Sequence, residues 1–426
     1  WLIAFPVMMS ILIEQLINIT DALFLGHVGD VELGASALAG IWFWAIYMLG
    51  LGFSMGLQVV IGRRNGEQRY EETGKAFIQG LFFLSMFAVT VCLVSKTLSP
   101  ILLKHLIISE DIYHAVIRYL DWRMWGLLFS FPFLALRSFL VGITKTKALN
   151  VAAFMAVLVN IPTNWLLIFG FDMGISGAAI ASSFAELCSL AILSVYMYRH
   201  IDKKAYGLYW RIDVKILKEV FSVSIWSMLQ FFTSVAAWFV FFLAIERLGE
   251  TELAISNIVR SVSTLFAVIV NALSAVTGSL VSNLIGAGER DAVFPLCRRI
   301  TRLGYAIGIP LIILALLFHR FVIGAYTDSP VIVQAACLPF AVMLFDYFLA
   351  LPSYVYLNAV VGTGATRAVF VFHVSTIIVY LLGLWGLSHC NVTLATYWLM
   401  EYLFVTLLGI QSIFYLKNDR TKNTNL

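Results

Sequence analysis

Long apolar runs recur along almost the whole chain and constrain its fold more than any other feature. Residues 80–93, 152–170, 303–318 and 369–387 approach or reach the roughly 20 apolar residues with which a helix crosses about 30 Å of hydrocarbon. Of the 426 residues, 61% are hydrophobic and 12% are charged, against about 25% charged in a soluble domain. Lipid cannot satisfy the backbone N–H and C=O groups of an open strand, so the runs are expected to be helices. The sequence therefore predicts an all-α integral membrane protein.

The runs divide into twelve predicted membrane helices. They cover residues 1–25, 35–61, 76–95, 115–141, 148–170, 174–198, 216–245, 252–284, 303–323, 331–361, 368–387 and 391–416. A polar stretch, 199–215, separates six helices from six, and we place the boundary between an N-terminal lobe (1–205) and a C-terminal lobe (206–426) within it. The chain begins at Trp1 without a methionine, so we expect a trimmed N-terminus. Residues 2–13 lack the basic lead and cleavage site of a signal peptide and are expected to begin the first membrane helix.

Lysine and arginine residues concentrate in alternate loops. They gather after the second, fourth, sixth, eighth and tenth predicted helices and at the end of the chain. The loops after odd-numbered helices are poor in basic residues, except the third, which has Lys96, Lys104 and Arg118. Cytoplasmic loops carry the excess of positive charge in membrane proteins. We therefore predict a multi-pass protein of a bacterial-type inner (plasma) membrane, with both termini cytoplasmic.

The two halves of the sequence repeat one another at an offset of 220 residues. The block FPFLALRSFLVGITKTKA (131–148) aligns without gaps with LPSYVYLNAVVGTGATRA (351–368). Because each repeat holds an even number of helices, both halves keep the same orientation in the membrane. We expect two six-helix lobes related by a pseudo-twofold axis along the membrane normal, with a substrate cavity where they meet.

Polar residues in the first predicted helix form a stripe. Glu14, Asn18 and Asp21 stand at i, i+4 and i+7 and so share one helical face. A carboxylate at the centre of a membrane helix costs about 2.5–3.5 kcal/mol on insertion scales, so intramembrane acids usually mark ion or substrate pathways. The alternative is an interfacial acid whose side chain reaches water. We interpret Asp21 as an ion-coupling carboxylate, with Glu14 and Asn18 beside it.

The fifth predicted helix carries a matching polar set. Asn160 and Asn164 are one turn apart, and Pro162 between them frees a backbone carbonyl. Amide and carbonyl oxygens beside a carboxylate suit a hard cation such as Na⁺, and they equally suit a protonated carboxyl. The alternative is that these amides only join helices. Asp21, Asn160 and Asn164 are therefore candidate ligands of Na⁺ or partners of a proton.

Candidate substrate-binding residues lie in the second half. Asp346 is in the middle of the tenth predicted helix between Phe345 and Tyr347, which gives an anionic centre with aromatic walls. This combination suits a lipophilic cation through charge and cation–π attraction; the alternative is a paired structural acid. Gln230 and Ser234 add an uncharged polar cluster in the seventh helix.

Motifs of soluble enzymes are missing from the sequence. It has no P-loop lysine, HExxH, GxSxG or glycine-rich dinucleotide turn, and its five cysteines are scattered singly. Arg137, Glu186 and Arg260 fall in or near predicted helices, where we expect structural ion pairs. We therefore expect no enzyme activity, no cofactor and no nucleic-acid partner. A transporter without an ATP site is driven by an ion gradient, here H⁺ or Na⁺.

Several segments together resemble the multidrug and toxic compound extrusion (MATE) family of prokaryotes over essentially the whole chain. The resemblance rests on Pro6 fifteen residues before Asp21, on TDALFLGHVGD, on NIPTNWLLIFGF followed by GISGAAIASS, and on the paired VGITKTKA and VGTGATRA. It implies a V-shaped pair of six-helix lobes that exchange cationic drugs for H⁺ or Na⁺ by alternating access. It also implies ion-site roles for Asp21, Asn160, Asn164 and Ser182, and matches Asp346 to the helix 10 aspartate of the NorM branch.

Two departures leave the coupling ion open. One branch of the family has an aspartate where Asn164 stands, and the NorM branch has a helix 7 glutamate where this chain offers Gln230, Thr233 and Ser234. We predict a monomeric exporter of small cationic or amphipathic molecules, in contact with membrane lipid. The alternative within transporters is a flippase for lipids or lipid-linked saccharides; its anionic substrate would favour basic cavity residues, whereas the intramembrane acids here favour cations.

Overall fold

The computed structural model describes most of the chain. It covers residues 3–107, 109–246, 248–326, 329–390 and 392–424. Some side chains within these helices also lie outside the described part, among them those of Glu14 and Asn18. Statements below refer to the described residues.

The described residues fold into helices joined by loops, with no strand. The elements are α1 (Ala4–Gly26), α2 (Asp30–Gly66), α3 (Tyr70–Leu106), α4 (Glu110–Arg123), the 3₁₀ turn η1 (Met124–Gly126), α5 (Leu127–Gly142), α6 (Lys147–Trp165), the π-helical turn η2 (Leu166–Gly170), α7 (Gly174–His200), α8 (Val214–Glu246), α9 (Glu250–Gly286), the 3₁₀ turn η3 (Arg290–Ala292), α10 (Val293–Leu317), α11 (His319–Gly324), α12 (Pro330–Gly362), α13 (Thr366–Leu387) and α14 (Leu394–Thr424).

Length and composition make these helices suited to a membrane. Eleven helical spans of the described chain are long and apolar enough to cross one, and residues Ala4–Ile13 of α1 form a further, shorter apolar stretch. The predicted all-α membrane fold is therefore confirmed. Two predicted helices are interrupted: 115–141 is divided by η1 into α4 and α5, and 303–323 is divided between α10 and α11.

The helix bounds repeat as the sequence does. Both α2 and α9 have 37 residues, and their first and last residues stand 220 positions apart. Gly29 and Gly249, the residues before them, match as well; Gly249 has a φ of 143°, which favours glycine. The internal duplication therefore extends from the sequence blocks to the helix boundaries.

The chain divides into two compact units, Trp1–Met228 and Leu229–Leu426, so the division falls within α8. The first half of α8 packs closely on α2 of the first unit. A Cβ atom at Gly52 would lie 2.6 Å from the Cα of Met228, and one at Gly56 would lie 2.5 Å from the Cα of Ser224. These glycines let two helix backbones approach one another. The lobe boundary at 205/206 stays a prediction.

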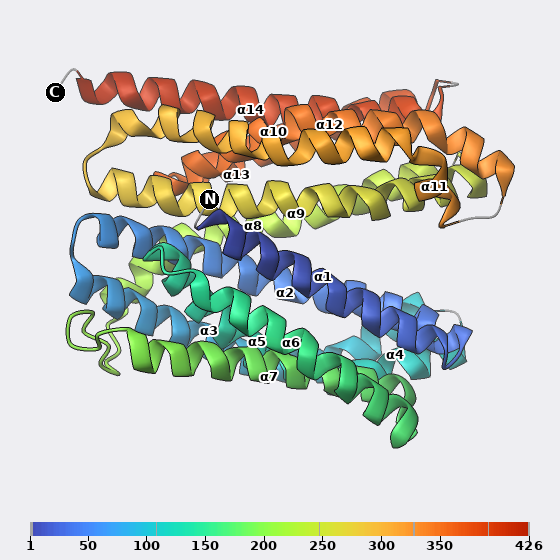
Figure 1. Cartoon of the computed structure of the whole chain (residues 1–426), viewed down its shortest axis with the longest axis horizontal. Coiled ribbons are helices and arrows are strands. Elements are labelled where there is room, and N and C mark those ends of the chain that lie inside the picture. The colour runs from blue at the N-terminus through green and yellow to red at the C-terminus, as the bar shows by residue number, and fades with distance from the viewer. Residues whose placement is uncertain (1–2, 108, 247, 327–328, 391, 425–426) are drawn as a thin grey trace. The chain divides into compact units, whose positions relative to one another are not determined.

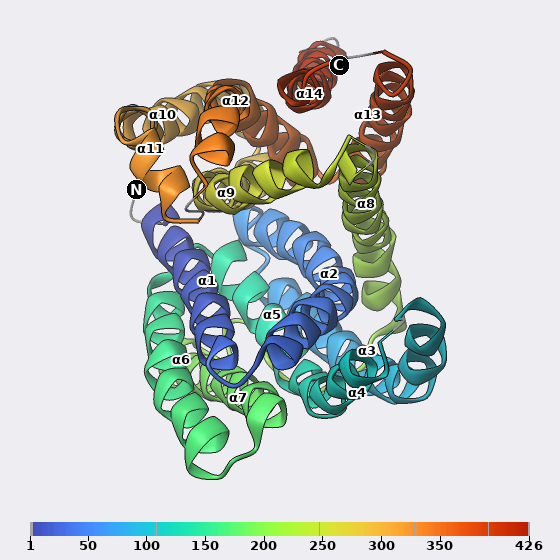
Figure 2. The ribbon, with the colours of Figure 1, turned by 90° about the vertical axis from the view of Figure 1, so that its right-hand side faces the viewer.

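In the first unit, α1, α6 and α7 pack side by side, and α2 packs against α3, α4 and α5 (Figures 1 and 2). Small residues permit close packing, since a Cβ atom at Gly142 would lie 2.5 Å from Cγ2 of Ile61. The fully buried side chains include Phe53, Phe131 and Phe139. This packing holds α1 against the helix pair that carries the predicted ion-site residues.

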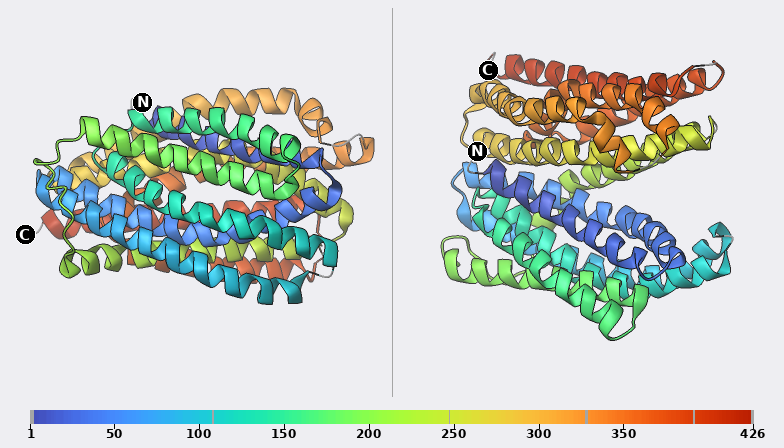
Figure 3. Two further views of the ribbon diagram at one scale, coloured as in Figure 1. Left: turned by 90° about the horizontal axis from the view of Figure 1, so that it is seen from below. Right: turned by 45° about the vertical axis from the view of Figure 1, so that its right-hand side comes forward.

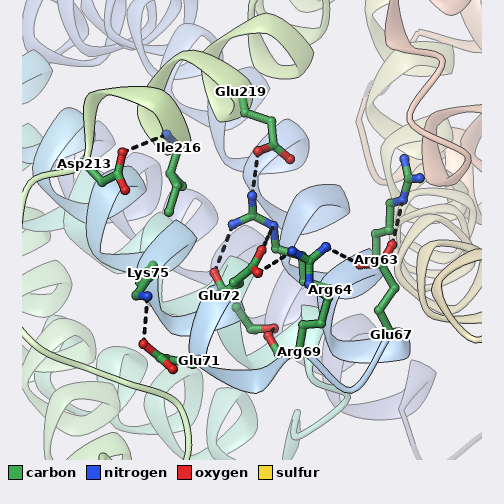
Figure 4. A network of polar contacts seen from close by, with 11 residues as sticks. Arg63, Arg64, Glu67, Arg69, Glu71, Glu72, Lys75, Asp213, Ile216 and Glu219 are labelled. Atoms are coloured by element: carbon green, nitrogen blue, oxygen red, sulfur yellow. Dashed lines mark hydrogen bonds and ion pairs between the residues drawn. The ribbon is translucent and has the colours of Figure 1, made fainter.

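A charged network lies where α2 ends, α3 begins and α8 begins (Figure 4). At its centre, the 7% exposed side chain of Arg64 donates hydrogen bonds to the Glu72 carbonyl oxygen (3.0 Å) and to Oε2 of Glu219 (2.6 Å). Surrounding ion pairs are Arg63–Glu67, Arg69–Glu67, Arg69–Glu72 and Lys75–Glu71. Nearby, Gln79 Nε2 donates to the carbonyl oxygen of Arg211 (2.7 Å). The 201–213 segment and the start of α8 are thus fixed to the first unit.

In the second unit, α12 packs against α9, α10 and α14, and α13 packs against α14 (Figure 3). Tyrosine hydroxyls join these helices through backbone carbonyls. Tyr347 donates to the carbonyl of Gly304 (2.8 Å), and Tyr402 donates to the carbonyl of Val342 (2.6 Å). The second bond joins α14 to α12 one turn before Asp346.

Candidate ion site

Asp21 accepts hydrogen bonds from two neighbouring helices. Its Oδ1 accepts one from Nδ2 of Asn164 on α6, and its Oδ2 accepts one from Oγ of Ser182 on α7, each at 2.5 Å. The carboxylate is partly buried, while Asn164 and Ser182 are buried. Short hydrogen bonds of this kind, with an ionised acceptor, are the strong ones. The structure therefore brings together three predicted ion-site residues that are far apart in the sequence.

Asn160 completes the cluster. Its Oδ1 accepts a second hydrogen bond from Nδ2 of Asn164 (3.1 Å), and its side chain is fully buried. Two atoms of the amide pair, Asn160 Nδ2 and Asn164 Oδ1, are buried and have no hydrogen-bond partner within the protein. Buried amides usually satisfy these groups. The site thus holds unused hydrogen-bonding capacity directly beside a carboxylate.

Both amides can serve either charge state of Asp21. As placed, Asn164 donates to an ionised carboxylate. If the amide of Asn164 turned by 180°, its Oδ1 would face Asp21 and accept the proton of a carboxylic acid. The same turn would present oxygens of Asp21, Asn160, Asn164 and Ser182 to Na⁺, which binds oxygen ligands.

The local sequence explains how α6 presents these amides. Asn160 and Asn164 stand one turn apart on one face, and Pro162 between them lacks a backbone N–H, which interrupts the helical hydrogen bonds there. The α-helix ends at Trp165 and continues as the π-helical turn η2. Such turns occur frequently at functional sites.

An ion pair lies one turn further along α7. Glu186 follows Ser182 by four residues and binds the guanidinium of Arg123 with both oxygens, at 2.7 and 3.0 Å. The side chains are 12% (Arg123) and 22% (Glu186) exposed. The expected ion pair for Glu186 is therefore confirmed, whereas Arg260 bonds instead to Asn257 Oδ1 (3.4 Å) and lies over the ring of Phe242. Arg123 was missed because it ends an amphipathic segment that reads as an interfacial helix end.

The predicted substrate-binding residues are dispersed in the second unit. Asp346 on α12 is partly buried, and its Oδ1 has no hydrogen-bond partner within the protein. Tyr347 is 3% exposed and packs against α10, so its hydroxyl serves helix packing. Ser234 on α8 donates to the carbonyl of Gln230 (2.9 Å) and lies 3.0 Å from Nε2 of His373 on α13. A substrate role for these residues stays a prediction.

A second acid was not singled out from the sequence. Glu401 on α14 accepts a hydrogen bond from the hydroxyl of Tyr380 on α13 (2.6 Å), and its charge acts on Asp346. Its position in the run YWLMEYLFV, a lone acid in an apolar helix, is the signal that marks it. The buried ring of His373 lies two turns before Tyr380, with Nδ1 unpartnered within the protein.

Comparison with known proteins gives the family. The sequence profile of the MatE family matches residues 6–166 and 227–385, which is well over half of the chain and includes both repeats. The chain belongs to the MATE family of transporters. Its membrane helices and its transporter class, in place of an enzyme fold, follow from this membership.

Relatives of this MATE transporter extend over most of its length. The multidrug resistance protein NorM of Vibrio cholerae is 24% identical over 398 residues, with 90% of this chain and 84% of the relative covered. A probable multidrug resistance protein NorM of Xanthomonas axonopodis is 26% identical over 381 residues, covering 86% and 80%. Two solved structures share the fold at 16% identity. One is an outward-facing multidrug resistance MATE family transporter (TM-score 0.91, 99% and 95% covered), and the other is the Vibrio cholerae MATE transporter VcmN in its bent form (TM-score 0.89, 99% and 96% covered).

The geometry of this MATE transporter assembles four of the six predicted ion-site residues: Asp21, Asn160, Asn164 and Ser182. The side chains of the other two, Glu14 and Asn18, lie outside the described residues. That these residues bind and couple an ion stays a prediction. The fold of the family, by contrast, is established.

Proposed function

We propose that this transporter exports cationic or amphipathic organic molecules in exchange for H⁺ or Na⁺, with Asp21 as the ion-coupling carboxylate. The observation that carries the proposal is the Asp21 cluster: an intramembrane acid held by Asn164 and Ser182, beside two unpartnered buried amide atoms. The names of the NorM relatives, which are multidrug resistance proteins, support the substrate class.

Coupling requires that the ion bind two conformations with different affinity. In the ion-free form, Asn164 and Ser182 donate to both oxygens of Asp21 and hold α1 against α6 and α7. Binding a cation removes the negative charge that these donors stabilise, and so changes how tightly α1 is held. That difference biases alternating access of the two lobes, in an inner membrane with both termini cytoplasmic.

The alternative, a flippase for an anionic lipid-linked saccharide, has less support. Such a substrate would be recognised by buried basic groups that are free to bind phosphate. In the first unit, Arg123 is already bound at both ends of its fork by Glu186. The unpartnered Asp346 Oδ1 in the second unit favours a cation instead.

The proposal is tested with purified protein in proteoliposomes that contain a fluorescent organic cation, under separate H⁺ and Na⁺ gradients. Wild type is expected to move the cation under at least one gradient, and Asp21→Asn to lose that response by at least ~100-fold, because an amide cannot be neutralised by a cation. Asp111→Asn, an exposed position in the first turn of α4, is the matched control. No cation movement by wild type under either gradient contradicts the proposal and favours the flippase.

A further inference from the structure

The Arg123–Glu186 pair belongs to the same network as Asp21. Ser182 and Glu186 share one face of α7, since they are four residues apart. Ser182 binds Asp21 while Glu186 binds Arg123. The charge of Arg123 acts on Asp21 through space. Two helices, α4 and α7, therefore place one positive and one negative side chain beside the candidate ion site.

Arg123 is held as a fixed charge. Glu186 takes both terminal nitrogens of the guanidinium, and the ring of Phe43 on α2 lies 3.8 Å from its central carbon. Such a cation–π contact and a bidentate carboxylate both restrict the planar group. Gly126 closes the remaining side, since a Cβ atom there would lie 2.5 Å from Arg123 Nη1 and 2.6 Å from Glu186 Oε2. The φ of Gly126 is −57°, so space rather than backbone conformation requires this glycine.

We infer that Arg123 and Glu186 set the charge balance of the ion site, with Glu186 keeping the guanidinium off Asp21. The inference rests on the ion-binding role proposed above for Asp21. A free guanidinium beside a carboxylate forms a bidentate pair, and Arg123 in that pair would occupy the oxygens that a cation needs. Glu186 supplies a competing carboxylate at a fixed distance. Arg123 and Glu186 are thus positioning residues, and Asp21 stays available to the ion.

The groups around the site make this pair the charged element to vary. From α4, Arg123 and the buried phenol of Tyr119 face it; from α7, Ser182 and Glu186 do; and α6 contributes uncharged amides. Removing the negative member leaves an excess positive charge near Asp21, and removing the positive member leaves an excess negative charge. An opposite charge within a few ångströms favours the ionised form of a carboxyl, and a like charge disfavours it. The two single variants should therefore act in opposite directions.

The test is a pH titration of the carboxylic-acid C=O infrared band of Asp21 in the purified protein, with the band assigned by its loss in Asp21→Asn. Glu186→Gln is expected to lower the pH of half-protonation by about one unit, and Arg123→Gln to raise it by about one unit. The double variant, which restores the net charge, should return close to wild type. Glu186→Asp keeps the charge and should also stay close. The control Arg290→Gln, in an exposed ion pair of the second unit, should not move the midpoint.

Opposite displacements that cancel in the double variant support the inference. Equal losses of thermal stability in both single variants, with no displacement or with displacement in one direction, overturn it, because a purely structural pair predicts that result. If Glu186→Gln fails to fold, the comparison of Arg123→Gln with the double variant and with Glu186→Asp still decides. The titration does not depend on transport. A wild-type protein without gradient-driven transport would therefore refute the proposed function, while the displacements would still judge the charge-setting role.

Discussion

Replacing Ser182 by alanine tests how the protein controls the charge of Asp21. The hydroxyl of Ser182 donates to Oδ2 of Asp21 at 2.5 Å, and Asn164 separately serves Oδ1. The alanine therefore removes one donor from one oxygen and leaves the other oxygen bound. Ser182 is 4% exposed, so water cannot readily replace the lost hydroxyl. The ionised form of Asp21 loses stabilisation that the protonated form needs much less.

The size of the effect follows from one charge-assisted hydrogen bond. Such a bond contributes about 1.5–3 kcal/mol, and one pH unit corresponds to about 1.4 kcal/mol. Because Asp21 itself keeps some exposure, we take the lower end. The pH at which Asp21 is half protonated should rise by about one unit in Ser182→Ala. In proteoliposomes, the pH optimum of proton-driven export should move upward by a similar amount.

Two variants separate this effect from general damage to α7. Ser182→Thr keeps a hydroxyl and should retain most of the wild-type titration. Ser183→Ala removes a neighbouring hydroxyl that donates within α7 to the carbonyl of Ala179 (2.8 Å), and should not move the midpoint of Asp21. A midpoint that stays in place or falls in Ser182→Ala would refute the hydrogen-bond argument. It would mean that Ser182 does not stabilise the carboxylate.

Two further predictions concern stability. Gly74→Ala on α3 would place a Cβ atom well inside contact distance of the backbone carbonyl of Tyr206; we expect a loss of about 1–3 kcal/mol and faster proteolysis of the 201–213 segment, whereas Gly34→Ala, which meets nothing within 4 Å, should be neutral. Tyr380→Phe removes the donor to Glu401, so the melting temperature in detergent should fall by the equivalent of about 1–2 kcal/mol; an unchanged melting temperature would show that water replaces the phenol.

Helix positions followed from the sequence because membrane helices have simple requirements. Apolar length, polar loops and the 220-residue repeat locate each span, and the bounds of α2 and α9 agree with the repeat to the residue. Asp21, Asn160 and Asn164 could also be predicted as partners, since polar residues in apolar helices turn away from lipid. Ser182 required the family resemblance, because one serine in a helix of small residues carries no distinctive pattern.

The remaining features depend on tertiary contacts. Arg123 stands in the polar segment EDIYHAVIRYLDWR, where sequence alone indicates an interfacial helix end. Only the packing of α4 on α7 brings it to Glu186. Likewise, the burial of Arg64 beneath Glu72 and Glu219 could not be predicted from a basic loop that looks fully exposed. Charge partners across helices have no fixed sequence spacing, so their pairing emerges only with the fold.

The duplication explains the backbone of the second unit but not its chemistry. Positions 220 residues after Asp21, Asn160 and Ser182 hold Phe241, Tyr380 and Tyr402. Phe241 is fully buried and packs against aromatic rings, at 5.2 Å from Trp398, so the second unit places a hydrophobic core where the first holds an acid. A carboxylate and an aromatic ring impose different solvation costs. The halves therefore share a fold while only the first carries this ion site, and the loss of coupling in Asp21→Asn should not be compensated by an equivalent acid on α8.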